Sequence, residues 1–101
     1  MKSRKRSKKE EIKIVVVTNN RIYDTIIKNK NIYDFVNFPI EELLLADDIY
    51  VIYSKEKIFT KNMTIKGRDI YSTFIIVKKK KNKYISLTNE DIKNVMNLLL
   101  K

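Results

Sequence analysis

The side chains that could do chemistry in this sequence are its lysines and arginines, because the usual catalytic groups are missing. The sequence contains no His and no Cys. Cys–His and Ser–His–Asp mechanisms are therefore excluded, as are disulfides and metal sites built on imidazole or thiolate ligands. A single Gly also excludes the G-x-G-x-x-G and P-loop motifs, whose glycines let backbone N–H groups approach phosphate.

Carboxylates are the remaining acid–base groups, and they occur as adjacent pairs. The pairs are Glu41–Glu42, Asp47–Asp48 and Glu90–Asp91. Two-metal or glycosidase-type chemistry needs carboxylates that converge across a cleft, whereas neighbours on a strand point to opposite faces. We therefore expect these pairs in turns and helix caps, and we predict a protein that is not an enzyme and uses no metal or cofactor.

Basic residues outnumber acidic residues by 22 to 12, which gives the chain a net charge of +10. A field of this sign attracts polyanions and speeds encounters with them. We therefore predict that the partner is nucleic acid (DNA or RNA), or a host ribonucleoprotein or protein complex, and not a membrane. The predicted binding residues are Lys2, Arg4, Lys5, Arg6, Lys8, Lys9, Lys66, Arg68, Lys78, Lys79, Lys80, Lys81 and Lys83.

The abundance of basic residues can also be explained without a binding function. A lysine run is commonly a solvated turn, and a basic tail can serve solubility alone. Lys outnumbers Arg by 18 to 4, which is typical of AT-rich coding, whereas phosphate clamps more often use the planar fork of Arg. Tyrosines on predicted strands can either stack on unpaired bases or fill the core and its rim. We favour the second interpretation, because no RNP-like motif surrounds these tyrosines. These tyrosines are Tyr50, Tyr53, Tyr71 and Tyr84.

The chain divides into a charged arm and one domain. Residues 1–11 are predicted to form a disordered basic arm, because no apolar residue follows Met1 there and the like charges repel. Residues 12–101 are predicted to form a single domain, the default for a chain of 101 residues. No uncharged run approaches the ~20 residues that a membrane span needs, so we expect a soluble protein that acts inside a cell.

Short β-branched segments predict most of the strands. Asn19–Asn20 is expected to form a hairpin turn, because Asn tolerates positive φ. Residues 69–77 are expected to form the strongest strand, which is apolar on both faces and therefore central, and residues 78–83 to form the connection that follows it. The strands are expected at residues 12–18, 21–28, 49–53, 69–77 and 84–87. Residues 58–66 are expected to be irregular, with a short strand and a loop as one option, and Gly67 is expected in a turn.

Two helices are expected. Asn31 can cap a short helix over residues 32–37, with Asp34 in its first turn. Thr88 is the expected N-cap of a C-terminal helix, and Asp91 can complete a variant of the capping box. The apolar stripe of that helix has helical spacing and comprises Ile92, Val95, Met96 and Leu99.

Residues 40–53 are ambiguous from pattern alone. Pro39 and Glu41–Glu42 resemble a helix start, yet the segment fits a strand–turn–strand equally well. Together the elements predict an α+β fold. We expect a small mixed or antiparallel sheet of about five to six strands, a short helix near residues 31–37 and a C-terminal helix near residues 89–100.

Three segments, DDIYVIYSKE (47–56), GRDIYSTFIIV (67–77) and YISLTNEDI (84–92), carry a resemblance. Residues 12–99 resemble an uncharacterised family of small α+β domains that phages, plasmids and conjugative elements of low-GC bacteria carry. Ser72 stands where that family has Gly, and Asn37–Phe38 replaces a Gly pair. The resemblance implies strands over residues 40–53 and an accessory protein of a mobile element in the cytoplasm of a bacterial host. It carries over no functional residue.

Two functions are compatible with the sequence. The first is a basic binding protein that contacts nucleic acid, or a nucleic-acid-binding complex, through its Lys and Arg clusters. The alternative is a phage- or plasmid-encoded inhibitor of a host defence ribonucleoprotein nuclease, similar in role to an anti-CRISPR protein, which acts by protein–protein contact. Binding that weakens steeply with salt would favour the first, because phosphate contacts release counterions.

Overall fold

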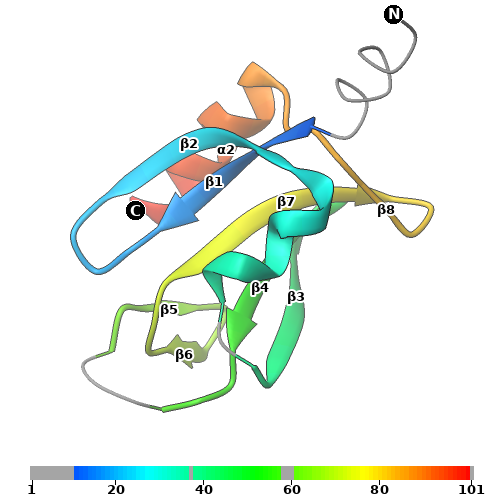
Figure 1. Cartoon of the computed structure of the whole chain (residues 1–101). Coiled ribbons are helices and arrows are strands. Elements are labelled where there is room, and N and C mark those ends of the chain that lie inside the picture. Colours follow the sequence, from blue (N-terminus) through cyan, green and yellow to red (C-terminus); the bar gives the residue numbers. More distant parts are fainter. Residues whose placement is uncertain (1–10, 37, 58–60, 101) are drawn as a thin grey trace, which may run out of the picture.

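The computed structural model describes residues 11–36, 38–57 and 61–100. The fold is α+β, with a six-stranded antiparallel sheet, a two-stranded sheet, a short 3-10 helix and a C-terminal α-helix (Figure 1). The strands are β1 (Glu11–Val17), β2 (Ile22–Lys28), β3 (Ile40–Ala46), β4 (Ile49–Ser54), β5 (Met63–Ile65), β6 (Arg68–Ile70), β7 (Phe74–Lys80) and β8 (Lys83–Ile85). The helices are η1 (Asn29–Phe35) and α2 (Asn89–Leu99).

β7 is the central strand of the large sheet, whose order is β2-β1-β7-β4-β3, with β8 also paired to β7. Its side chains alternate between two buried clusters, with Phe74 and Ile76 on one face and Ile75 and Val77 on the other. All four are fully buried, and each contributes about 1.5–3 kcal/mol relative to an exposed position. The prediction of a central strand covered on both sides is confirmed.

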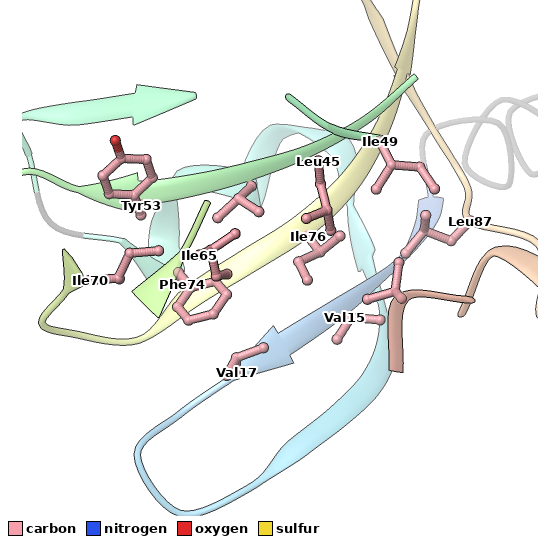
Figure 2. Close-up of a cluster of buried hydrophobic side chains, with 12 residues drawn as sticks. Val15, Val17, Leu45, Ile49, Tyr53, Ile65, Ile70, Phe74, Ile76 and Leu87 are labelled. Atoms are coloured by element: carbon pink, nitrogen blue, oxygen red, sulfur yellow. The ribbon is translucent and has the colours of Figure 1, made fainter. Parts of the chain in front are cut away.

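Different elements cover the two faces of the sheet. On the face of Ile76, which we call the helix face, α2 packs through Val95. The β5–β6 hairpin packs on the same face through Ile65 and Ile70 (Figure 2). On the opposite face, which we call the η1 face, η1 packs through Ile32. The apolar runs of the central strands therefore follow from burial on both sides.

The hairpin of β1 and β2 forms where the sequence predicts it, but its turn uses a different device. Neither Asn19 nor Asn20 has a positive φ, so the expectation of a left-handed turn is wrong. Instead the hydroxyl of Thr18 accepts hydrogen bonds from the N–H groups of Asn20 and Arg21, at 3.2 and 3.0 Å. A Thr side chain that bonds to the backbone two or three residues onward can organise a turn without a left-handed residue.

The strand expected over residues 69–77 is in fact two strands, β6 and β7, which separate at residues 71–73. Asn62 holds this break in place. Its side-chain amide donates to Ser72 O at 2.9 Å and to Val17 O at 3.3 Å, and its N–H donates to Ile70 O at 2.7 Å. Because Asn62 is distant in sequence from the break, the local pattern of residues 69–77 carries no sign of it. Tyr71, expected on a strand, lies in this break.

Residues 40–53 form β3, a turn at Asp47–Asp48, and β4. The strand–turn–strand alternative is therefore confirmed. Glu41–Glu42 lies on a strand, so our expectation of a turn or a helix cap for this pair is wrong, whereas Asp47–Asp48 and Glu90–Asp91 do occupy a turn and a helix start. The left-handed residue of the turn is Asp48, with φ 58°, a conformation that Asp adopts more readily than most residues.

The two helices agree with their sequence-based predictions to different degrees. η1 is a 3-10 helix over Asn29–Phe35 that begins after Lys28 without a side-chain cap, so Asn31 lies inside it and its predicted capping role is wrong. α2 begins at Thr88 with the complete predicted capping box. Within the described ranges, no helix is long and apolar enough to cross a membrane.

Candidate nucleic-acid interface

The β7–β8 hairpin carries the lysine run, and it is tighter than the sequence indicates. β7 continues to Lys80 and β8 begins at Lys83, so only Lys81 and Asn82 form the turn. Our expectation of a connection over residues 78–83 is therefore wrong. Both turn residues are left-handed, with φ 53° and 65°, as a two-residue type I′ hairpin requires. The lysines on the strands consequently have fixed directions.

Successive lysines of β7 point to opposite faces of the sheet, and the first two are already paired. On the helix face, Lys78 Nζ lies 2.9 Å from Asp91 Oδ2. On the η1 face, Lys79 Nζ lies 2.8 Å from Glu42 Oε1. All four side chains of these pairs are largely buried, with between 18% and 28% of their surface exposed. The structure therefore removes Lys78 and Lys79 from the candidate interface.

The partners of Lys79 form a small polar network on the η1 face. Tyr84 OH donates to Glu42 Oε2 at 2.6 Å and lies 3.0 Å from Tyr33 OH. Burial acts to raise the pKa of Glu42, but hydrogen bonds from Lys79 and Tyr84 outweigh it, so the pKa is lowered. The same hydrogen bond favours the charged form of Lys79 and therefore raises the pKa of Lys79. These groups neutralise one another and leave little charge for a ligand.

The second predicted basic group, Lys66 and Arg68, lies around the β5–β6 turn and is also engaged. Lys66 Nζ donates to Leu44 O at 3.0 Å. Arg68 Nη1 donates to Tyr53 OH at 2.9 Å and to Glu41 Oε1 at 3.2 Å. The bond from Tyr53 is the main cause that lowers the pKa of Glu41, and burial is the main cause that raises the pKa of Tyr53. The role of this group is therefore partly structural.

Arg68 also borders a shallow pocket of about 330 Å³. Lys55 and Lys57 add positive charge to its lining, but Glu41 and Asp69 offset that charge. Asp69 is further bound to Lys61, at 3.7 Å. This pocket therefore offers an anion much less net charge than its lysines alone would indicate.

The exposed members of the run are Lys80, Lys81 and Lys83, at the end of the β7–β8 hairpin. In the described part of the chain, none of their ammonium groups makes an ion pair or a side-chain hydrogen bond. Lys80 lies directly opposite Lys83, so both side chains project from the helix face. Like charges directly opposite each other destabilise a strand pair by roughly 0.2–1 kcal/mol, and a left-handed Lys81 costs on the order of 1 kcal/mol more.

Lys13 lies close to this hairpin, although the sequence analysis did not single it out. β8 fits between β1 and β7 at this end of the sheet, because Lys13 N–H donates to Ser86 Oγ and Leu87 N–H donates to Lys13 O, both at 3.0 Å. The side chain of Lys13 shares the helix face with Lys80 and Lys83, since it alternates with Ile12 and Ile14 of the η1 face. Only the hydrogen bonds of Lys13 to Ser86 and Leu87, which directly follow β8, reveal this proximity.

The predicted basic arm joins the domain at the same end of the sheet. Glu11, which we predicted as part of the arm, is the first residue of β1. Two residues later, Lys13 contacts Ser86, which directly follows β8. The predicted binding residues of the arm lie outside the described residues: Lys2, Arg4, Lys5, Arg6, Lys8 and Lys9. The structure thus places the attachment point of the arm at the same end of the sheet as the β7–β8 hairpin.

The tyrosines follow the core-and-rim interpretation where their positions are described. Tyr53 is buried, and Tyr50 and Tyr84 are half-buried. The hydroxyls of Tyr53 and Tyr84 are bound to Glu41 and Glu42. These rings therefore do not form an open stacking platform.

Carboxylates do not gather into a metal site within the described residues, where no group of three or more candidate ligands occurs. Searches against protein-family models, curated proteins and solved structures found no match to this chain. The resemblance to a mobile-element family stays a prediction. Functional inference therefore depends on the geometry of the basic hairpin.

Proposed function

We propose that this protein is a non-enzymatic nucleic-acid-binding protein that contacts the phosphate backbone through the β7–β8 hairpin. The observation that carries the proposal is the cross-strand pair of exposed lysines, Lys80 and Lys83, with Lys81 at the turn. A phosphate between two ammonium groups converts their mutual repulsion into attraction to a shared anion. The arrangement is unfavourable for the free protein and favourable for a polyanion complex.

The rest of the chain supports a backbone contact without base readout. The three hairpin lysines are point charges, which position a protein on phosphate but carry no sequence information. Tyr53 and Tyr84 are engaged with carboxylates, so they give aromatic stacking on bases little support. We therefore propose binding that tolerates many sequences, to which the basic residues of the predicted arm add phosphate contacts.

The test is the salt dependence of binding to a fluorescent oligonucleotide, measured by anisotropy for single-stranded RNA, single-stranded DNA and duplex DNA. The hairpin variant is Lys80→Gln/Lys81→Gln/Lys83→Gln. Each phosphate contact adds about 0.7–0.9 to the slope of log K against log salt, so we expect this variant to lose roughly two units of slope.

The matched control removes the same charge elsewhere. Lys55, Lys57 and Lys61 are exposed and lie between β4 and β5, after the end of β4 that is farther from the hairpin. The variant Lys55→Gln/Lys57→Gln/Lys61→Gln has the same net charge as the hairpin variant. We expect this control to retain most of the wild-type slope. An equal loss of slope in both variants would mean that binding depends only on the net charge of the protein, and it would contradict the proposal.

The inhibitor alternative is addressed by a pull-down from bacterial lysate treated with nuclease. A nucleic-acid binder loses its partners under nuclease, whereas a stoichiometric protein partner that survives would favour the inhibitor. A chain that lacks residues 2–9 is run in parallel, and we expect it to bind oligonucleotides more weakly while the hairpin contribution persists.

A further inference from the structure

The large sheet ends in two edge strands, β3 and β2, which differ in how their outer backbone groups are protected. β3 directly follows Pro39, and its register with β4 shifts between Leu44 and Ala46. Lys66 Nζ also donates a hydrogen bond to the carbonyl oxygen of Leu44, at 3.0 Å. Prolines, bulges and lysines are the devices by which edge strands avoid pairing with other chains, so β3 is a protected edge.

β2 has no proline and no bulge in its described residues, and its two charged residues, Asp24 and Lys28, have opposite signs. It pairs with β1 in unbroken register over its whole length. Lys13 bonds away from β2, to Ser86 and Leu87, and Thr18 N–H bonds Arg21 O. Because antiparallel pairs alternate, the residues of β2 that bond to β1 are the odd-numbered ones. The N–H and C=O groups that point outward from the sheet are therefore those of Ile22, Asp24 and Ile26, together with the N–H of Lys28.

The outward-facing part of β2 is accessible. Asp24, Ile26 and Lys28 are all exposed, and Ile26 exposes 59% of its surface, a large fraction for an aliphatic residue within a strand. Because the β1 ladder uses the odd-numbered residues, Asp24 and Ile26 make no hydrogen bond within the described chain, whereas the C=O of Lys28, the N-cap of η1, accepts the first bond of that helix. A regular, exposed edge with an apolar residue at its middle is a template for another strand.

We propose that β2 pairs with β2 of a second copy of this chain, antiparallel about a two-fold axis at Ile26. In this register Ile26 lies opposite its own copy, and Asp24 lies opposite Lys28 of the second copy on both sides of the axis. Opposite charges directly across two strands stabilise the pair, whereas like charges destabilise it. The exposed apolar residue is covered and both charged residues find partners.

The charge pattern selects this register over its neighbours. Outward-facing residues must lie opposite one another, or the hydrogen bonds between the two edges cannot form. Centring the axis at Asp24 places two carboxylates directly opposite each other. Centring it at Thr25 places Asp24 opposite Ile26 and leaves Lys28 without a carboxylate. Only the register centred at Ile26 is complementary in both charge and apolar surface.

The interface is isologous, since each residue contacts its counterpart under the same two-fold axis. Pairing continues the large sheet from one subunit into the other. A single strand edge buries little surface, so the dimer belongs to the class of small, weak interfaces. It forms without nucleic acid and therefore does not depend on the function proposed above.

The decisive experiment is engineered disulfide formation in the full chain, without nucleic acid. The wild type has no Cys, so each variant has one thiol. Directly opposite Cα atoms lie about 5.5 Å apart, within disulfide range, so we expect Ile26→Cys to form a covalent dimer. In Asp24→Cys the two thiols are offset by four residues, roughly 13 Å along the strand, and we expect cross-linking at least about tenfold slower. Equal rates, or a faster reaction at position 24, would overturn the register.

Charge exchange provides an independent readout by sedimentation equilibrium. Asp24→Lys and Lys28→Asp each place like charges opposite one another, and we expect either to weaken association at least about tenfold. The double variant Asp24→Lys/Lys28→Asp restores opposite charges, and we expect it to recover association to within about threefold of wild type. A wild-type chain that sediments as a monomer throughout, or single variants that associate like wild type, would overturn the proposal. Thermal unfolding of each variant checks that its fold is intact.

Discussion

Asp91 performs two tasks with one carboxylate oxygen. Its Oδ2 accepts a hydrogen bond from the N–H of Thr88 and another from Lys78 Nζ, both at 2.9 Å. The first bond completes the capping box of α2, and the second ties α2 to β7. The bond from Thr88 is the main cause that lowers the pKa of Asp91, and Lys78 lowers it further. A single residue thus joins helix initiation to tertiary packing.

The lowered pKa of Asp91 predicts how its contribution changes with pH. A carboxyl whose folded pKa lies below its unfolded value, about 3.9 for Asp, stabilises the fold above that value and loses the contribution as pH falls through the folded pKa. We therefore expect Asp91→Asn to lower the free energy of unfolding clearly at pH 7 and progressively less from about pH 4 downward. Urea denaturation at several pH values measures this difference.

Thr88→Ala provides the comparison for that experiment. It removes the hydroxyl that accepts from Asp91 N–H but leaves the carboxylate in place. Loss of an N-cap side chain costs about 1 kcal/mol, and this loss should persist at low pH because no titrating group is removed. A stability difference for Asp91→Asn that stays constant down to pH 2 would contradict the role assigned to its charge.

At the scale of elements, Asn62 connects β5 to the break between β6 and β7 and to the end of β1. Its side-chain amide satisfies the carbonyl oxygens of Ser72 and Val17. We expect Asn62→Ala to lower the free energy of unfolding by about 2 kcal/mol, since two acceptors lose their donor in a partly buried place. Asn94→Ala, at an exposed helix position, is the matched control and should be neutral or slightly stabilising. Equal effects in denaturant titrations would contradict this view of Asn62.

The β7–β8 hairpin predicts a conflict between stability and binding. Lys80→Glu places opposite charges at the Lys80↔Lys83 pair, and we expect it to stabilise the protein by about 0.5 kcal/mol. The same change should weaken oligonucleotide binding more than Lys80→Gln does, because it adds repulsion to phosphate. Thermal unfolding and anisotropy on one set of samples measure both effects. A variant that is less stable than wild type would argue against the assigned repulsion.

At the scale of the whole molecule, the sheet separates two cores, and β1, β4 and β7 each contribute side chains to both. Ile75 and Ile76 are adjacent and fully buried, yet they belong to different clusters. We expect Ile75→Val and Ile76→Val each to cost about 0.5–1.5 kcal/mol. Because the two side chains share no cluster, the double variant should be additive within about 0.5 kcal/mol. Coupling well beyond that value in equilibrium unfolding would indicate that the cores are not separated.

Local signals predicted much of the fold. Residues 89–99 combine a capping sequence with an apolar stripe, and residues 74–77 are β-branched or aromatic on both faces. Such patterns act over a few residues, so they identify α2 and β7 without knowledge of the rest. The hairpin at Asn19–Asn20 was placed correctly for the same reason, although Thr18 and not positive φ organises it.

Contacts between distant residues decided the remainder. The break at residues 71–73 depends on Asn62, and the candidate site depends on which carboxylates reach which lysines. By itself the sequence determined an excess of basic charge, the absence of the usual catalytic groups and the strong local elements. Only the tertiary structure decided that Lys78 and Lys79 are neutralised by Asp91 and Glu42 while Lys80, Lys81 and Lys83 remain exposed. The physical reason is that a strand alternates its side chains between two faces, and different elements bring carboxylates to each face.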